Sequence, residues 1–293
     1  MQLQNIFTEI EKKDPEFYNK IDSRRKVMKD FAKFSGRLSL ASLPLALGAM
    51  LNKAYSKDTS VNTVVDVLTF ALKLEYLESR FYLNGLAASG LIPNDAFGSL
   101  GAFQQISTHE AAHVTFLKQT ITALGSTPIA EPAFDFTAKG TFPNPFLPAN
   151  YAVFLAISQT FEDTGVRAYK GQAPNLIGTA NRPYLTAALR IHSVEARHAS
   201  RVRKLRHDIN GATVSGNVKP WITLAQSGID TGSGTANAAV QQSYAGEDLT
   251  TQAGVNIVGI GGNSFITAAA ASESFDEPLT MAQVITIVTP FFA

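Results

Sequence analysis

Apolar and polar positions alternate with a helical period in four long segments of the chain, all between residues 61 and 210. In each segment the apolar side chains return every three or four positions, which is typical of amphipathic helices. The pattern predicts helices at about 61–88, 97–124, 149–171 and 182–209. Pro183 suits the first turn of the last helix and Gly125 the end of the second, because proline fits an initial turn and glycine a left-handed terminus.

The connections between these helices differ in length. Short links that contain glycine and proline join the first helix to the second and the third to the fourth, so each pair is predicted to form an antiparallel hairpin. Between the second and third helices lie about 25 residues with five prolines. An extended segment of that length can run back along a helix of about 40 Å. Short, long, short is the pattern of ferritin-like four-helix bundles, so we expect an all-α core with a long crossover.

Residues 1–56 form a charged N-terminal extension, expected to be helical, that resembles a twin-arginine export signal. Arg24 and Arg25 precede a moderately apolar stretch at 38–51, and the small residues at 54 and 56 offer a cleavage site. This interpretation predicts a periplasmic or otherwise exported protein. The alternative is a cytoplasmic protein with an amphipathic N-terminal helix. The apolar stretch has about 14 residues, fewer than the ~20 that a membrane-spanning helix needs, so we expect no stable membrane span.

Residues 211–293 form a C-terminal extension rich in glycine, alanine, serine and threonine, without the apolar content of an independent core. They contain a short β-prone run at 255–260 and a final apolar segment at 279–292. We expect this irregular extension to dock on the bundle, which is predicted to occupy residues 57–210. Low-complexity disorder is the alternative.

Composition narrows the chemistry that the chain can carry. It has no cysteine, which excludes disulfides, thiolate metal sites, iron–sulfur clusters and cysteine nucleophiles. The net charge of +1 gives no field of either sign that would indicate a nucleic-acid partner. A metal site in this chain must therefore use carboxylate and imidazole ligands, which suit iron, manganese or zinc.

Two short phrases occur twice along the four helices, in the same order. In the first phrase a glutamate is followed seven positions later by a tyrosine, and in the second a glutamate is followed three positions later by a histidine. The members are Glu75 with Tyr82, Glu110 with His113, Glu162 with Tyr169, and Glu195 with His198. The glutamates of the two phrases are 35 positions apart in the first copy and 33 in the second. This repetition indicates an internal duplication.

Helix geometry tests whether the repeated residues can meet. At 1.5 Å per residue, Glu75 lies ~20 Å from the end of its helix and Glu110 ~20 Å from the start of the next, so they share a level. The corresponding lengths in the second hairpin are ~14 Å and ~20 Å, a difference that the 171–178 link must absorb. Four glutamates facing a core repel one another and lose hydration, and two divalent cations would remove that cost.

The segments 74–82 and 194–203 resemble those of the ferritin-like domain proteins, a family that includes plant desiccation-related proteins and bacterial relatives. The resemblance covers residues 60–210, and the ending at 275–280 is also similar. It implies a four-helix bundle with two metal ions, iron first and manganese or zinc as alternatives. The implied ligands are Glu75 and His113 for one ion, Glu162 and His198 for the other, and Glu110 and Glu195 as bridges. Tyr82 and Tyr169 are implied as neighbouring hydrogen-bond donors or redox-active groups.

The expected function is oxidation of ferrous iron by a small oxidant, dioxygen or peroxide, in stress protection. A non-catalytic, desiccation-protective protein with a stabilising metal site is the alternative from another class. His109 to His113 also match the helix motif of zinc metalloproteases, which leaves the duplication unexplained. Three residues near the predicted ligands stay open as additional ligands: Glu78, His109 and His192. A homo-oligomer formed through the extensions is a further expectation.

Overall fold

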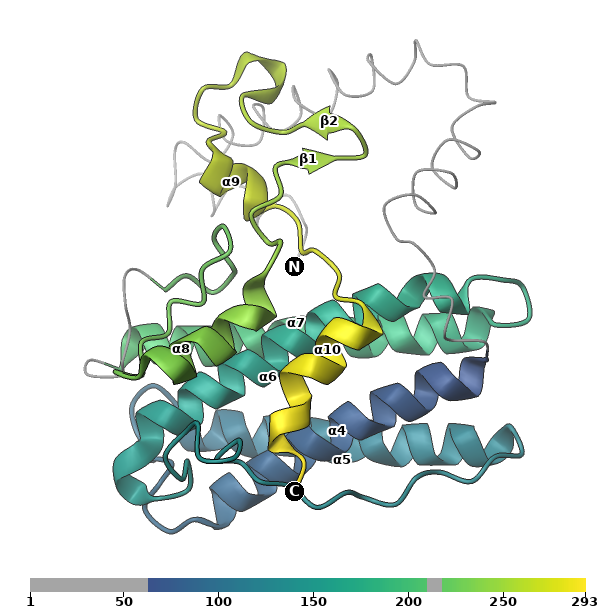
Figure 1. Cartoon of the computed structure of the whole chain (residues 1–293), viewed down its shortest axis with the longest axis vertical. Helices are drawn as coiled ribbons and strands as arrows, with labels where there is room; N and C mark the ends of the chain where they lie inside the picture. Colours follow the sequence, from purple (N-terminus) through teal and green to yellow (C-terminus); the bar gives the residue numbers. More distant parts are fainter. Residues whose placement is uncertain (1–62, 210–217) are drawn as a thin grey trace, which may run out of the picture. The chain divides into compact units, whose positions relative to one another are not determined.

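Four long helices form a bundle of two antiparallel hairpins (Figure 1). They are α4 (Val64–Ala87), α5 (Ser99–Ala123), α6 (Tyr151–Gln172) and α7 (Arg182–Asp208). In this computed structural model, α4 packs mainly on α5 and α6 on α7, with further contacts of α4 with α6 and of α5 with α7. The predicted all-α bundle with a long crossover between its second and third helices is confirmed.

The structure describes residues 63–209 and 218–293, which lie within one unit, Tyr55–Ala293. The predicted export signal lies outside these residues, so export stays a prediction, as does the division of the chain at 56 and 210. Among the described helices, none has both the length and the apolar character needed to cross a membrane.

The helix ends follow from local chemistry. Thr63 and Asp66 form a reciprocal capping box at the start of α4, with 3.1 Å bonds in both directions. Asp95 accepts from the backbone N–H of Ser99 at 3.0 Å and so satisfies the first turn of α5. As predicted, α5 ends at a left-handed glycine, Gly125, whose φ is 80°. Pro183 lies in the first turn of α7.

The link between α6 and α7 resolves the mismatch in helix length. A 3-10 turn, η2 (Ala173–Leu176), follows α6 directly and adds to its rise before α7 begins. The long crossover returns along α4, where the Tyr76 hydroxyl donates to the carbonyl of Ile129 at 3.2 Å. Near its middle, Phe134 forms an isolated β-bridge with Phe292, which ties the crossover to the C-terminal end of the chain.

Helix α6 is surrounded on every side, since each residue from 154 to 169 is buried. One face of α6 carries Gln159, Asp163 and Arg167, which we call the polar seam. These side chains bind the C-terminal extension as well as other bundle helices. The Tyr244 hydroxyl donates to Asp163 at 2.6 Å, and Arg167 pairs with Glu247 at 2.7 Å. Burial of these groups is tolerated because each has a partner.

The C-terminal extension contains short elements separated by turns. They are α8 (Gly234–Gln241), β1 (Thr251–Gln252), β2 (Val255–Asn256), α9 (Ala268–Ser272) and α10 (Met281–Val288), with β1 and β2 forming an antiparallel pair. Helix α10 packs against α6 (Figure 1). The N–H of Leu279 donates to the carbonyl of Arg167 at 3.1 Å, and a β-carbon at Gly171 would collide with the Leu279 carbonyl. Glycine at 171 therefore lets the segment before α10 approach the α6 backbone.

Candidate metal centre

The six predicted ligands meet at one level of the bundle, in two overlapping groups. The first group is Glu75, Glu110, His113 and Glu195, and the second is Glu110, Glu162, Glu195 and His198. Within each group, one oxygen or nitrogen atom from every residue lies within 4.8 Å of the others. Glu110 and Glu195 belong to both groups, so the arrangement can hold two ions that share two carboxylates. All four helices contribute.

Each histidine turns the same ring nitrogen towards the carboxylates. Nδ1 of His113 lies 3.1 Å from Glu75 and 3.2 Å from both Glu110 and Glu195. Nδ1 of His198 lies 2.8 Å from Glu110 and 3.3 Å from Glu162. Nδ1 is therefore the atom that either ring would offer to a metal ion.

The two repeated tyrosines bind the glutamates reciprocally across α4 and α6. Tyr82 on α4 donates to Glu162 on α6 at 2.5 Å, and Tyr169 on α6 donates to Glu75 on α4. Burial, followed by the negative charge of Glu162, raises the pKa of Tyr82 well above its ordinary value. The same causes, with Glu75 as the charge, act on the pKa of Tyr169. Both phenols are therefore held as neutral donors to a carboxylate.

His109 and His192, the two histidines considered as additional ligands, differ in their contacts. Nδ1 of His109 lies 2.9 Å from Nε2 of His198, and Nε2 of His109 lies 2.6 Å from the Gln105 amide. His109 thus contacts the outer nitrogen of a candidate ligand, as expected for a supporting residue. His192 instead pairs its Nδ1 with the backbone carbonyl of Val166 at 3.0 Å. Neither His109 nor His192 belongs to a ligand group.

In the metal-free site, the pKa values of the buried glutamates differ widely. Burial, followed by the charge of Glu110, raises the pKa of Glu75 to about 7. Burial and the charges of Glu110 and Glu75 raise the pKa of Glu195 well above its usual range. Burial alone would also raise the pKa of Glu110, but hydrogen bonds from His113 and His198 outweigh it and lower the value to about 2. The metal-free site is therefore stabilised by bound protons, which a cation would have to displace.

The histidine pKa values move in the opposite direction to that expected from burial. Desolvation would lower the pKa of His198, but the charges and hydrogen bonds of Glu162 and Glu110 outweigh it and raise the value to about 11. Hydrogen bonds with Glu110, Glu195 and Glu75 likewise raise the pKa of His113 well above its usual range against the effect of burial. Both rings therefore carry a second proton in the metal-free protein and act as cations among the carboxylates.

Glu78 is a fifth buried carboxylate at the site, and it belongs to neither ligand group. In the second copy of the duplicated phrase its place is taken by Gly165. A β-carbon at Gly165 would lie 3.2 Å from Oε1 of Glu78 and 3.4 Å from Oε2 of Glu195. Gly165 is not among the residues predicted from the sequence, although a position-by-position comparison of the two phrases places it opposite Glu78. This glycine clears the space that Glu78 occupies.

The donor set fits divalent cations. Both oxygens of Glu195 and Oε2 of Glu162 are buried. Within the described ranges, Oε2 of Glu195 has no partner, and the other two oxygens each face only an imidazole nitrogen, at 3.2 and 3.3 Å. Buried carboxylate oxygens normally have partners, so unsatisfied ones that converge from different helices indicate a cation position. The metalloprotease alternative lacks this support. Its first histidine, His109, is in neither ligand group, and the next acidic residue after His113, Glu131, pairs with Arg80 at 2.6 Å.

Comparison with known proteins agrees with this geometry. Residues 63–208 match the family model described as a ferritin-like domain. The matched segment runs from the residue that caps α4 to the end of α7, so it contains both hairpins and all six candidate ligands. No curated protein matches the chain.

Proposed function

Because the chain belongs to the ferritin-like domain family through residues 63–208, we propose that it is a dinuclear metal protein that oxidises ferrous iron with dioxygen or peroxide. The single observation that carries this proposal is the pair of ligand groups that share Glu110 and Glu195. Two ions bridged by carboxylates are the arrangement that di-iron and di-manganese bundles use. Protection against oxidative stress is the role that this reaction would serve.

In this proposal each ion has its own pair of end ligands. Glu75 and His113 hold one ion, and Glu162 and His198 hold the other. Iron is the metal we expect first, while manganese and zinc also suit carboxylate and imidazole. Iron bound at both positions would supply two electrons, one from each ferrous ion, which with two protons convert one dioxygen to hydrogen peroxide.

The chain's own residues favour that oxidation in two ways. Four carboxylates surround the ions with negative charge, and this stabilises the more highly charged ferric product over the ferrous substrate. Tyr82 and Tyr169 hold Glu162 and Glu75 in place through hydrogen bonds from buried phenols. We propose that these tyrosines orient the end ligands, with a redox role as the second hypothesis for them.

A second candidate function is a non-catalytic protein that the metal stabilises, as in a desiccation-protective role. The burial of the glutamates favours it, since all four are fully shielded from solvent and a structural ion needs no open route. The two candidates differ in reactivity: a structural site holds its ions without consuming oxygen.

A metal and oxygen assay tests the proposal. Protein prepared metal-free and then loaded anaerobically should bind about two ferrous ions per chain, and it should consume oxygen when air is admitted. Binding without oxygen consumption would favour the structural role, and failure to bind would refute both. Glu162→Ala separates both from a zinc protease, because a site at His109 and His113 would not depend on Glu162.

A further inference from the structure

The two ends of the duplicated site are packed differently. At one end Tyr82 lies among three fully buried phenylalanines, Phe81, Phe103 and Phe154. The rings of Phe81 and Phe154 stack with centroids 4.8 Å apart, and Phe103 meets Phe154 edge-on at 5.0 Å. Tyr82 stacks on Phe103 at 5.8 Å. We call these three phenylalanines the aromatic plug, because they fill the space beside the tyrosine.

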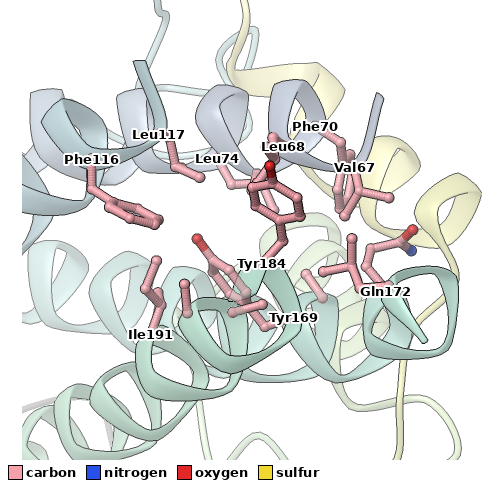
Figure 2. Close-up of a pocket in the computed structure, with 15 residues that line it drawn as sticks. Val67, Leu68, Phe70, Leu74, Phe116, Leu117, Tyr169, Gln172, Tyr184 and Ile191 are labelled. Atoms are coloured by element: carbon pink, nitrogen blue, oxygen red, sulfur yellow. The ribbon is translucent and has the colours of Figure 1, made fainter. Parts of the chain in front are cut away.

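At the other end the matching tyrosine, Tyr169, borders a cavity instead (Figure 2). Its lining is almost entirely apolar, with side chains from all four bundle helices. The polar exceptions are Gln172 and the hydroxyl groups of Tyr169 and Tyr184. The rim includes Phe116, which is 38% exposed, so the cavity reaches the surface beside α5. Figure 2 shows the Tyr169 ring among these lining residues.

The duplication explains why one end is filled and the other open. We align α4 with α6, and α5 with α7, on their repeated glutamates. Under that alignment each phenylalanine of the aromatic plug faces a smaller residue: Phe154 pairs with Val67, Phe81 with Ala168 and Phe103 with Ala188. All three smaller residues line the cavity. The cavity is thus the plug position with its three rings removed.

The size and chemistry of the cavity select its occupant. Its volume is about 20 Å³, on a scale where one water needs roughly 10–15 Å³, so it holds one very small molecule. Water requires two to four polar partners, and apolar cavities of this kind stay dry. A hydrocarbon chain is far too large. An uncharged diatomic gas fits both the volume and the apolar lining.

The cavity adjoins one half of the candidate metal centre. Tyr169, in its wall, donates to Glu75, and Leu74 in the wall precedes Glu75 on α4. Phe116 and Leu117 lie about one helical turn beyond His113 on α5. The wall therefore leads to the position formed by Glu75 and His113, and not to the one formed by Glu162 and His198.

We propose that this cavity is a dioxygen-binding site that admits the oxidant from the Tyr169 end only, towards the ion held by Glu75 and His113. This inference rests on the proposed oxidation of ferrous iron for the identity of the gas. The binding of a small apolar atom can be tested without any metal. The aromatic plug closes the equivalent route at the Tyr82 end.

Xenon under pressure is the probe for the cavity. Crystals of the full chain should show xenon among Val67, Ala168 and Ala188 and none beside Tyr82. Ala188→Phe, which restores the residue of the other half, should remove that xenon. Phe103→Ala, the matched control, should open a second xenon position beside Tyr82. Absence of xenon from the wild-type cavity would overturn the proposal. If Ala188→Phe does not fold, Ala188→Leu fills the same space with a smaller side chain.

Oxygen kinetics test the route itself. In iron-loaded protein, Ala188→Phe should raise the apparent KM for oxygen by about tenfold, equivalent to ~1.4 kcal/mol, while bound iron stays unchanged. An unchanged KM would overturn the role of the cavity as the oxygen route, even if xenon binds there. Failure to bind iron in the wild type would instead refute the proposed function, and the xenon result would stand separately.

Discussion

Tyr82 on α4 donates a 2.5 Å hydrogen bond to Glu162 on α6, 80 residues further along the chain. Its counterpart runs in the opposite direction, from Tyr169 to Glu75. Each copy of the duplicated phrase thus supplies the tyrosine that holds the glutamate of the other copy. The two halves cannot be separated without breaking both bonds, so the site is a property of the pair.

Removing either phenol should weaken metal binding without abolishing it. Tyr82→Phe and Tyr169→Phe each delete one hydrogen bond to an end ligand, and the loss of such outer partners lowers metal affinity roughly 10- to 100-fold. Titration of metal-free protein with ferrous iron under anaerobic conditions measures the change. Tyr151→Phe is the matched control, since the Tyr151 hydroxyl lies outside both ligand groups. Unchanged affinity in both variants would show that the tyrosines do not position the ligands.

Bridging and end ligands should differ in how many ions their loss removes. Glu195 belongs to both ligand groups, so Glu195→Ala should abolish binding of both ions. Glu162 belongs to one group, so Glu162→Ala should leave about one ion per chain. Metal content after dialysis, measured by atomic emission, distinguishes the two results. Equal losses in the two variants would contradict the shared-carboxylate arrangement.

Metal affinity should increase with pH. Glu75 has a pKa of about 7 and His198 of about 11 in the metal-free protein, so both hold protons at pH 6 that metal binding must release. Lowering the pH adds protons to the free site and not to the occupied one, and affinity therefore falls. Calorimetric titration in two buffers with different ionisation enthalpies counts the released protons. Binding with no proton release between pH 6 and 8 would contradict this picture.

Glu78→Gln should stabilise the metal-free protein at neutral pH. Burial, followed by the charges of Glu195 and Glu110, raises the pKa of Glu78 well above 4.5. The folded state must therefore take up a proton that the unfolded chain releases above pH 4.5, and this costs stability as the pH rises. Glutamine removes that cost, so we expect a gain of more than about 1 kcal/mol at pH 8 that disappears near pH 4.5.

Urea denaturation at several pH values measures the effect of Glu78→Gln, with Glu131→Gln at the exposed Arg80 pair as the control. A gain that did not depend on pH would indicate a packing effect instead. The iron content of Glu78→Gln also decides whether Glu78 is an additional ligand, because a ligand's loss would reduce it.

Breaking the polar seam should destabilise the whole unit. Asp163 is paired at 2.5 Å with Arg203 inside the protein, and removing one partner of a buried pair costs about 3–5 kcal/mol. Asp163→Ala should show this loss in thermal or urea denaturation. The pair of Lys204 with Asp208 lies one residue further along α7, and its lysine is 55% exposed. Lys204→Ala should therefore change stability by only about 0.5 kcal/mol or less.

The bundle and its six candidate ligands were predictable because both follow from local, periodic patterns in the sequence. Helical periodicity places Glu75 and Glu195 on core faces, and the repeated spacing selects them from the other acidic residues. The tyrosine hydrogen bonds needed a structure, since they join α4 to α6. The partners of Asp163 and Arg167 also could not be inferred, because Tyr244 and Glu247 lie in a segment with no regular pattern.

The surroundings of α6 indicate how much of the chain folds as one unit. Likeness to the family stops at residue 208, yet the side chains of Gln159, Asp163 and Arg167 are completed by residues beyond 218. A polypeptide cut at 208 would expose a carboxylate, a guanidinium and an amide on a helix that has no solvent-facing side. The segment that matches the family model is therefore shorter than the unit that folds cooperatively. The C-terminal extension is a structural part of that unit.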